Sequence, residues 1–300
     1  MGADTKPTNS VPSNVYPPAG RCIYCGTSQP PLSREHIIPL SLGGNLIIPK
    51  ESCKVCAKII NSEIETPIAH HEWGLFRSKR TFPTRRKKKR KTHITIQGRD
   101  GVQRSIPIGH HSTPVPMYKF GEARILAGLP LGLGDDQRWT MVMLSSHDEE
   151  MAMQQRFPEW NRTHTFRAMP HRFARLIAKI GHGYGTAELG FGTFTPLTTD
   201  LILGRSDDYY FYVGGSWDID AAIPGGNHIT NISFRFTSSH TAWAVVDIRL
   251  FSAVETPSYH VVVGEIDLTN PEHSRAFEQH RVSGKLALAR PQADLQRGGL

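Results

Sequence analysis

Hydrophobic and polar positions repeat with different periods along the chain. The clearest helical repeat covers residues 170–189, where apolar side chains recur at three- and four-residue spacing behind Pro170. Apolar runs rich in β-branched and aromatic residues predict strands at 92–98, 102–108, 138–145, 209–213, 229–236, 242–251 and 259–266. The pattern therefore predicts a mixed α+β domain, mainly antiparallel sheet, over residues 92–270. The polar residues 271–300 are expected to end the chain as a helix or a tail.

A shorter unit precedes this domain. Apolar runs at residues 37–42 and 46–48 flank a Gly-Gly-Asn turn and predict a hairpin. Residues 57–70 can form a helix that ends or kinks near Pro67. The expected architecture is a small ββα domain over residues 20–76 in an α+β protein.

Length and composition are those of an ordinary globular protein. The 300 residues are 38% hydrophobic and 21% charged, and no apolar run reaches the 18 residues that would indicate a transmembrane helix. Residues 1–19 lack the charged-then-apolar pattern of a secretory signal and are predicted to be a disordered lead. We expect a cytoplasmic protein with no membrane partner.

The net charge of +8 is concentrated in one segment, residues 77–91. This basic arm holds ten cationic residues and no acidic one: Arg77, Lys79, Arg80, Arg85, Arg86, Lys87, Lys88, Lys89, Arg90 and Lys91. The rest of the chain has 25 basic and 27 acidic residues, so it has no general attraction to nucleic acid. Such a segment binds DNA phosphates without sequence information. A nuclear localisation signal or a solvated face has the same composition.

All four cysteines lie in the first 56 residues, in the pairs Cys22-x-x-Cys25 and Cys53-x-x-Cys56. Two such pairs in a chain without a secretion signal predict one tetrahedral zinc site. With four protein ligands the zinc is structural, one ion per chain. Two disulfides or a redox CxxC are the alternatives.

The segment between the two cysteine pairs contains a sequence pattern that is typical of a known enzyme family. It reads Glu35-His36-Ile-Ile-Pro followed by Gly-Gly-Asn45, and it resembles the HNH (ββα-metal) endonucleases, in the subgroup with a four-cysteine zinc. The resemblance covers residues 20–75 and implies that His36 is the general base that activates water. It also implies that Glu35 binds a catalytic Mg²⁺ or Mn²⁺ and that Asn45 ties the hairpin loop. Adjacent strand residues can share a site only if the strand twists or bulges there.

The chain departs from the family pattern after the second cysteine pair. Most members have Asn where this chain has Ala57, which cannot bind a metal. Asn61 lies four residues on, on the same helical face, and is the expected helix-borne ligand, with Glu65 assisting or replacing it. The alternative is that both are solvated and that the metal site is degraded.

The resemblance predicts a metal-dependent endonuclease that hydrolyses double-stranded DNA with low sequence specificity, in defence against foreign DNA. The C-terminal domain would control oligomerisation as a homo-oligomer, or respond to an unknown regulatory ligand or protein. The alternatives are a non-catalytic zinc-stabilised DNA-binding module, an RNA-directed nuclease and a ligand-gated nuclease effector. On the long helix, Arg172, Arg175 and Lys179 share one edge and are expected to form a solvated face.

Overall fold

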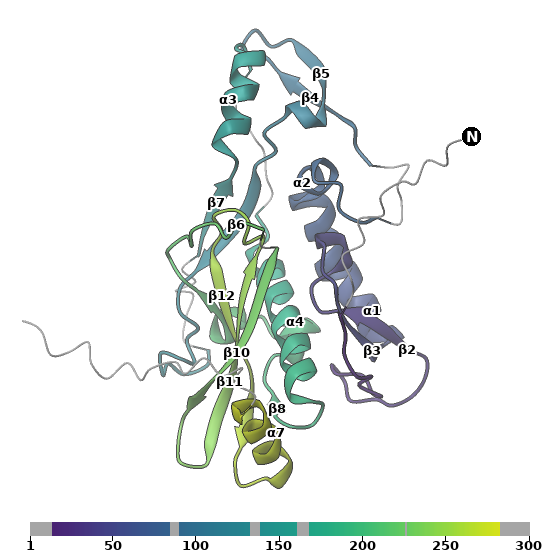
Figure 1. The fold of residues 1–300 in the computed structure, drawn as a ribbon, viewed down its shortest axis with the longest axis vertical. Helices are drawn as coiled ribbons and strands as arrows, with labels where there is room; N and C mark the ends of the chain where they lie inside the picture. Colours follow the sequence, from purple (N-terminus) through teal and green to yellow (C-terminus); the bar gives the residue numbers. More distant parts are fainter. Residues whose placement is uncertain (1–13, 85–89, 133–138, 161–167, 226, 283–300) are drawn as a thin grey trace, which may run out of the picture.

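The computed structural model describes residues 14–84, 90–132, 139–160, 168–225 and 227–282 (Figure 1). The predicted α+β class is confirmed. None of the helices in these ranges is long and apolar enough to cross a membrane.

The N-terminal sheet has three strands in the order β1-β3-β2. Strand β3 (Leu46–Cys53) pairs antiparallel with β2 (Leu32–His36) and parallel with the short β1 (Asn14–Val15). The prediction of a first strand over residues 37–42 is wrong, because this strand ends at His36 and residues Leu40–Leu42 form the 3-10 turn η1. Pro39 cannot donate a ladder hydrogen bond, and Ile37, Ile38 and Leu42 are buried in the core instead of alternating across a sheet.

A helical segment follows the second cysteine pair directly. It consists of α1 (Lys54–Ile59), the wider π-helical segments η2 (Ile60–Glu65) and η3 (Ile68–Glu72), and α2 (Gly74–Lys79). The helix begins three residues before the predicted start and continues past Pro67. The ββα order of the unit is therefore present.

The C-terminal region is built on a five-stranded antiparallel sheet. Strands β10 (His228–Phe236), β11 (Thr241–Leu250) and β12 (Ser258–Asp267) are neighbours, and β12 also pairs with β8 (Thr195–Pro196) and β9 (Val213–Gly215). The three long strands are confirmed. Helix α4 (Pro170–Leu189) has the predicted bounds and lies between this sheet and the N-terminal unit (Figure 1). The short helix α7 (Pro271–Val282) follows β12.

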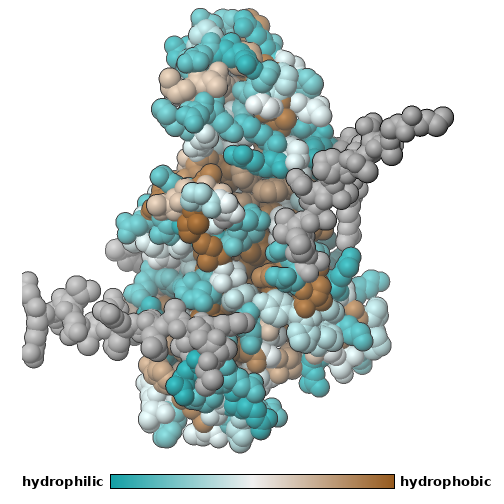
Figure 2. Space-filling view, viewed as in Figure 1, coloured by the Kyte–Doolittle hydropathy of each residue, from teal (hydrophilic) through white to brown (hydrophobic). Residues whose placement is uncertain are grey.

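The connecting segments form two further strand pairs and a helix. The predicted hairpin is confirmed as β4 (His93–Gln97) and β5 (Gln103–Pro107), and the strand predicted at 138–145 is confirmed as β7 (Trp139–Leu144). Strand β6 (Val115–Phe120), which pairs with β7, and helix α3 (His147–Arg156) were not predicted. Elements β4, β5 and α3 form the top end of the molecule in Figure 1, and Figure 2 shows mainly polar residues on its surface. Apolar residues gather below this end, where it joins the main body.

The strand predicted at residues 209–213 is wrong. Tyr209–Tyr212 form the helical turn α6, and β9 begins only at Val213. A short aromatic run has no period long enough to separate helix from strand. The small helix α5 (Thr199–Ile202) is a second turn of this kind beside α4.

One hydrophobic core joins the two parts of the chain. A single cluster of buried side chains contains Ile37 of the N-terminal unit, Ile177 of α4 and Val261 of β12. Gly181 lets α4 approach the sheet, because a Cβ there would lie 3.0 Å from Cβ of Val261. Helix α4 is therefore the layer on which both the N-terminal unit and the sheet pack.

Candidate functional site

The four cysteines converge at one edge of the N-terminal sheet. Their Sγ atoms all lie within 4.8 Å of one another, and none of the four is in a disulfide. Sγ of Cys25 lies 3.8 Å from Sγ of Cys53, the separation of two ligands in a tetrahedral site with Zn–S bonds of about 2.3 Å. Gly26, at φ +76°, closes the first knuckle with a hydrogen bond from its backbone N–H to Cys22 O. These residues could hold one structural zinc ion, and the disulfide interpretation does not apply.

Glu35 and His36 lie at the end of β2, where the strand is irregular. The pairing register shifts between Ser33 and Glu35, after which Glu35 lies opposite Ile48 and His36 opposite Ile47. The Glu35 side chain is mostly buried and turned toward α4. A local bulge is what adjacent strand residues need if both are to serve one site.

Lys179 of α4 reaches this strand end from the C-terminal region. Its Nζ lies 3.1 Å from Oε1 of Glu65 and 3.9 Å from Oε2 of Glu35. It also donates hydrogen bonds to the backbone carbonyls of His36 (2.5 Å) and Ile37 (3.2 Å). The residue is 1% exposed, so the prediction that it belongs to a solvated face is wrong. Burial lowers the pKa of Lys179, but attraction to Glu65 and Glu35 outweighs this and raises it above the ordinary value.

A third carboxylate, Glu51 of β3, is buried beside this group. It is 1% exposed, and neither of its side-chain oxygens has a hydrogen-bond partner among the described residues. Burial raises its pKa to about 8, with Glu35 and Glu65 adding to the rise and Lys179 opposing it. The Tyr24 hydroxyl lies near the carboxylate without the geometry of a hydrogen bond and also opposes the rise. Three carboxylates and one ammonium thus meet between β2, β3, η2 and α4.

Residues 22–72, which contain this strand end and the four cysteines, match the family model of the HNH endonucleases. This region is similar to an HNH endonuclease domain. Neither a curated protein nor a solved structure matches the chain.

The structure separates the two predicted helix ligands of the HNH region. Glu65 faces Glu35 across the Lys179 ammonium. Asn61 is exposed, and its Oδ1 accepts a local hydrogen bond from Oγ1 of Thr66 at 2.8 Å. Of the two, Glu65 is the residue that the helix brings to Glu35.

Asn45 lies where the hairpin loop joins β3. Its backbone carbonyl accepts the N–H of Asn14 at 3.1 Å, which ties β1 to the start of β3. Next to it, Gly44 packs so closely that a Cβ would lie 1.9 Å from Ile38 O, so a side chain at this position would collide with backbone. Asn45 therefore begins β3 at a closely packed loop.

HNH endonucleases use a catalytic divalent ion, and the acidic residues fit its chemistry. Glu35 and Glu65 offer the oxygen ligands that Mg²⁺ and Mn²⁺ prefer, and both already face one cation, the ammonium of Lys179. The buried carboxyl group of Glu51 lies near them, and its oxygens have no hydrogen-bond partner in the part of the chain that the structure describes. Among the described residues only the four cysteines bring three ligand atoms within 4.8 Å, so the carboxylates form a looser set around their cation.

His182 is a second residue of α4 that contacts the HNH region. Its Nε2 lies 2.9 Å from Ile23 O in the first zinc knuckle, and its ring lies 5.7 Å from that of Tyr24. Burial lowers its pKa to about 4, so the ring is neutral at pH 7. Lys179 and His182 are one turn apart on the otherwise apolar face of α4. Two polar residues within an apolar helical face are the sequence signal that could have revealed both.

Several cations of the basic arm have partners within the protein. Arg77 donates to Ser41 O at 2.6 Å and Ala69 O at 2.8 Å, and Nζ of Lys79 lies 2.6 Å from a carboxylate oxygen of Glu149. Further internal contacts link Arg80 to Glu149 (3.7 Å) and Arg90 to Phe82 O (2.6 Å). The predicted phosphate-binding residues Arg85 to Lys89 lie outside the described residues, and Lys91 is exposed.

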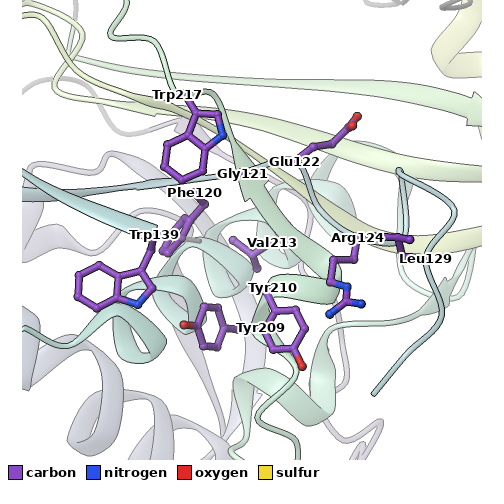
Figure 3. Close-up of a pocket in the computed structure, with 10 residues that line it drawn as sticks. All are labelled: Phe120, Gly121, Glu122, Arg124, Leu129, Trp139, Tyr209, Tyr210, Val213 and Trp217. Carbon is purple, nitrogen blue, oxygen red and sulfur yellow. The ribbon is translucent and has the colours of Figure 1, made fainter. Parts of the chain in front are cut away.

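The C-terminal region contains a cavity of about 380 Å³ away from the carboxylates. Its walls are mainly aromatic, and Figure 3 shows Trp139, Tyr209, Tyr210 and Trp217 around it with Arg124 at one side. The guanidinium of Arg124 lies 5.4 Å from the centre of the Tyr210 ring. The helical turn α6, which the sequence predicted as strand, supplies two of these rings.

Proposed function

We propose that this protein is a metal-dependent HNH endonuclease that hydrolyses phosphodiester bonds in DNA. The observation that carries the proposal is that Glu35 and Glu65 face one cation beside His36, within the region matched by the HNH family model. A strand carboxylate and a helix carboxylate around one positive charge form a small oxygen-ligand site next to a base.

In this mechanism His36 takes a proton from the water that attacks the phosphorus atom, because a neutral imidazole accepts protons near pH 7. Glu35 and Glu65 would hold the divalent ion, which stabilises negative charge on the phosphate and on the leaving oxygen. Lys179 fixes the backbone on which His36 sits, through its hydrogen bond to His36 O. Asn45 supports the loop after the strand. The zinc at the cysteines has only a structural role.

The proposed substrate is double-stranded DNA, bound through its phosphates by the basic arm, residues 77–91. Phosphate contacts give affinity without sequence readout, so low specificity is expected. Each chain has one proposed hydrolytic centre, so a double-strand cut would need two chains. We therefore propose that the protein acts as a homo-oligomer. Defence against foreign DNA in the cytoplasm is the proposed setting. The aromatic cavity is the proposed place for a regulatory ligand of the C-terminal region.

A plasmid cleavage assay with Mg²⁺ or Mn²⁺ tests the proposal. The purified protein should nick or linearise the plasmid, and His36→Ala should lower the rate by at least about 100-fold. His93→Ala, which changes an exposed histidine on β4, is the matched control and should cleave like the wild type. Cleavage that persists in His36→Ala excludes His36 as the base.

The second candidate is a non-catalytic DNA-binding module. Ala57 at the usual Asn position and an ammonium between the two carboxylates favour it. DNA binding without cleavage under any divalent ion would select this alternative. Cleavage of RNA but not of the plasmid would select an RNA-directed nuclease.

A further inference from the structure

The ammonium of Lys179 lies close to one carboxylate oxygen of Glu35 and one of Glu65, which are oxygens that a divalent ion could also bind. The ammonium is 3.1 Å from Oε1 of Glu65 and 3.9 Å from Oε2 of Glu35. It is held there by two backbone carbonyls, those of His36 and Ile37. The side chain comes from α4, outside the residues matched by the HNH family model.

Two acidic side chains contact the ammonium, and a third lies close by. Glu35 and Glu65 contact the ammonium of Lys179, and Glu51 is a third acidic group near it. Glu51 is fully buried, with both oxygens unpaired. Glu35 and Glu65 thus share a single ammonium, and a divalent ion would offer the same two side chains a second positive charge.

We propose that Lys179 and the divalent ion compete for Glu65 and Glu35, so that Lys179 sets the affinity of the site for the ion. When the ion binds, the ammonium gives up Glu65 and keeps its hydrogen bonds to the backbone of His36 and Ile37. Lys179 is thus a positioning residue that also weakens ion binding. This inference takes one point from the proposed function, namely that a divalent ion binds at this site.

Calorimetric titration of Mn²⁺ into the zinc-loaded full-length protein tests this competition. Lys179→Met removes the charge but keeps most of the side-chain volume, and it should bind Mn²⁺ at least about 10-fold more tightly than the wild type. Arg175→Met is the matched control on the same helix, because Arg175 pairs with Glu63 at 3.0 Å and not with the three carboxylates. Its affinity should equal that of the wild type.

Thermal unfolding gives a second readout. Without Mn²⁺, Lys179→Met should melt below the wild type, because it leaves buried carboxylates without a counter-charge. Mn²⁺ should then raise the melting temperature of Lys179→Met more than that of the wild type. Lys179→Gln, which loses the charge but keeps a donor, should behave in the same way.

Glu65→Gln covers the case in which neither Lys179 variant folds. It removes the carboxylate that the ion and the ammonium share, and it should weaken Mn²⁺ binding at least about 10-fold. Equal Mn²⁺ affinity in wild type, Lys179→Met and Lys179→Gln overturns the proposal, as does unchanged affinity in Glu65→Gln or no Mn²⁺ binding beyond the zinc site. If Mn²⁺ affinity depends on the Lys179 charge but the protein does not cleave DNA, only the proposed nuclease activity is refuted. If the protein cleaves DNA and all variants bind Mn²⁺ with equal affinity, only the proposed competition is refuted.

Discussion

The indole of Trp73 packs edge-on against the ring of Phe173, with ring centroids 5.8 Å apart. Its Nε1 donates to Pro116 O at 2.8 Å, and Trp73 is fully buried. This contact joins the helical segment of the HNH region to α4 and β6. The N-terminal unit therefore uses the C-terminal region as part of its own core.

Trp73→Ala should lower the free energy of unfolding by about 3–5 kcal/mol, because it removes a large buried ring and its hydrogen bond to Pro116 O. Urea unfolding followed by circular dichroism measures the change. Leu40→Ala, at an exposed position on η1, is the control and should stay within about 0.5 kcal/mol of the wild type. A loss below about 1 kcal/mol for Trp73→Ala would mean that the two regions are stable separately.

The cysteine site should contain about one zinc ion per chain by elemental analysis. Cys53→Ser should lower the zinc content and the melting temperature, because the two knuckles are then no longer held together. A chelator should destabilise the wild type in the same way, and added zinc should restore it. Wild-type protein without zinc but with an unchanged melting temperature would contradict this prediction.

Glu72 should make stability depend on pH. Its Oε1 accepts a hydrogen bond from the Tyr118 hydroxyl at 2.7 Å, and burial raises its pKa from 4.5 to about 7. The folded state therefore binds the proton more tightly than the unfolded state. The resulting stability is complete below pH 4.5 and is lost as the pH rises through 7.

Glu72→Gln should remove this dependence. The variant should match the wild type near pH 4 and exceed its stability by up to about 3 kcal/mol above pH 8. Urea unfolding at both pH values measures the difference. A variant that is less stable at high pH would show that the ionised carboxylate is stabilising.

The basic arm should divide into structural and phosphate-binding cations. Arg77→Ala should cost about 1–3 kcal/mol of stability, because it leaves the carbonyls of Ser41 and Ala69 without their charged donor. Neutralising residues 85–89 should weaken DNA binding. The slope of log affinity against log salt should become shallower by up to about 4. An unchanged slope would mean that these residues do not contact phosphate.

Local pattern predicted the elements that repeat regularly. Helix α4 and the three long strands followed from periodicity, because each has enough residues on one buried face to make the period visible. Strand β6 was missed because nearly all its side chains are buried and do not alternate. Residues 37–42 were assigned to a strand because they are as hydrophobic as a strand. This hydrophobicity reflects the packing of Ile37, Ile38 and Leu42 in the core.

The cysteine site was recognisable from spacing alone, because its ligands come in two local pairs. Lys179 was assigned to a solvated face since helical position alone did not reveal that carboxylates 114 or more residues earlier surround it. The sequence places Asn61 and Glu65 on one helical face, but the π-helical winding of η2 and the Asn61–Thr66 hydrogen bond decide which of them meets Glu35. Which of these two helix residues meets Glu35 therefore depends on tertiary packing, and the sequence pattern does not reveal it.

Glu65, and not Asn61, should be the helix residue on which cleavage depends. Glu65→Gln should reduce plasmid cleavage by at least about 100-fold, because a neutral amide binds Mg²⁺ poorly beside Glu35. Asn61→Ala should change the rate by less than about 3-fold, since its exposed side chain bonds only Thr66 in the described contacts. Raising the Mn²⁺ concentration should partly restore Glu65→Gln if the defect is in ion binding. A larger loss in Asn61→Ala than in Glu65→Gln would reverse the assignment and return the ligand role to Asn61.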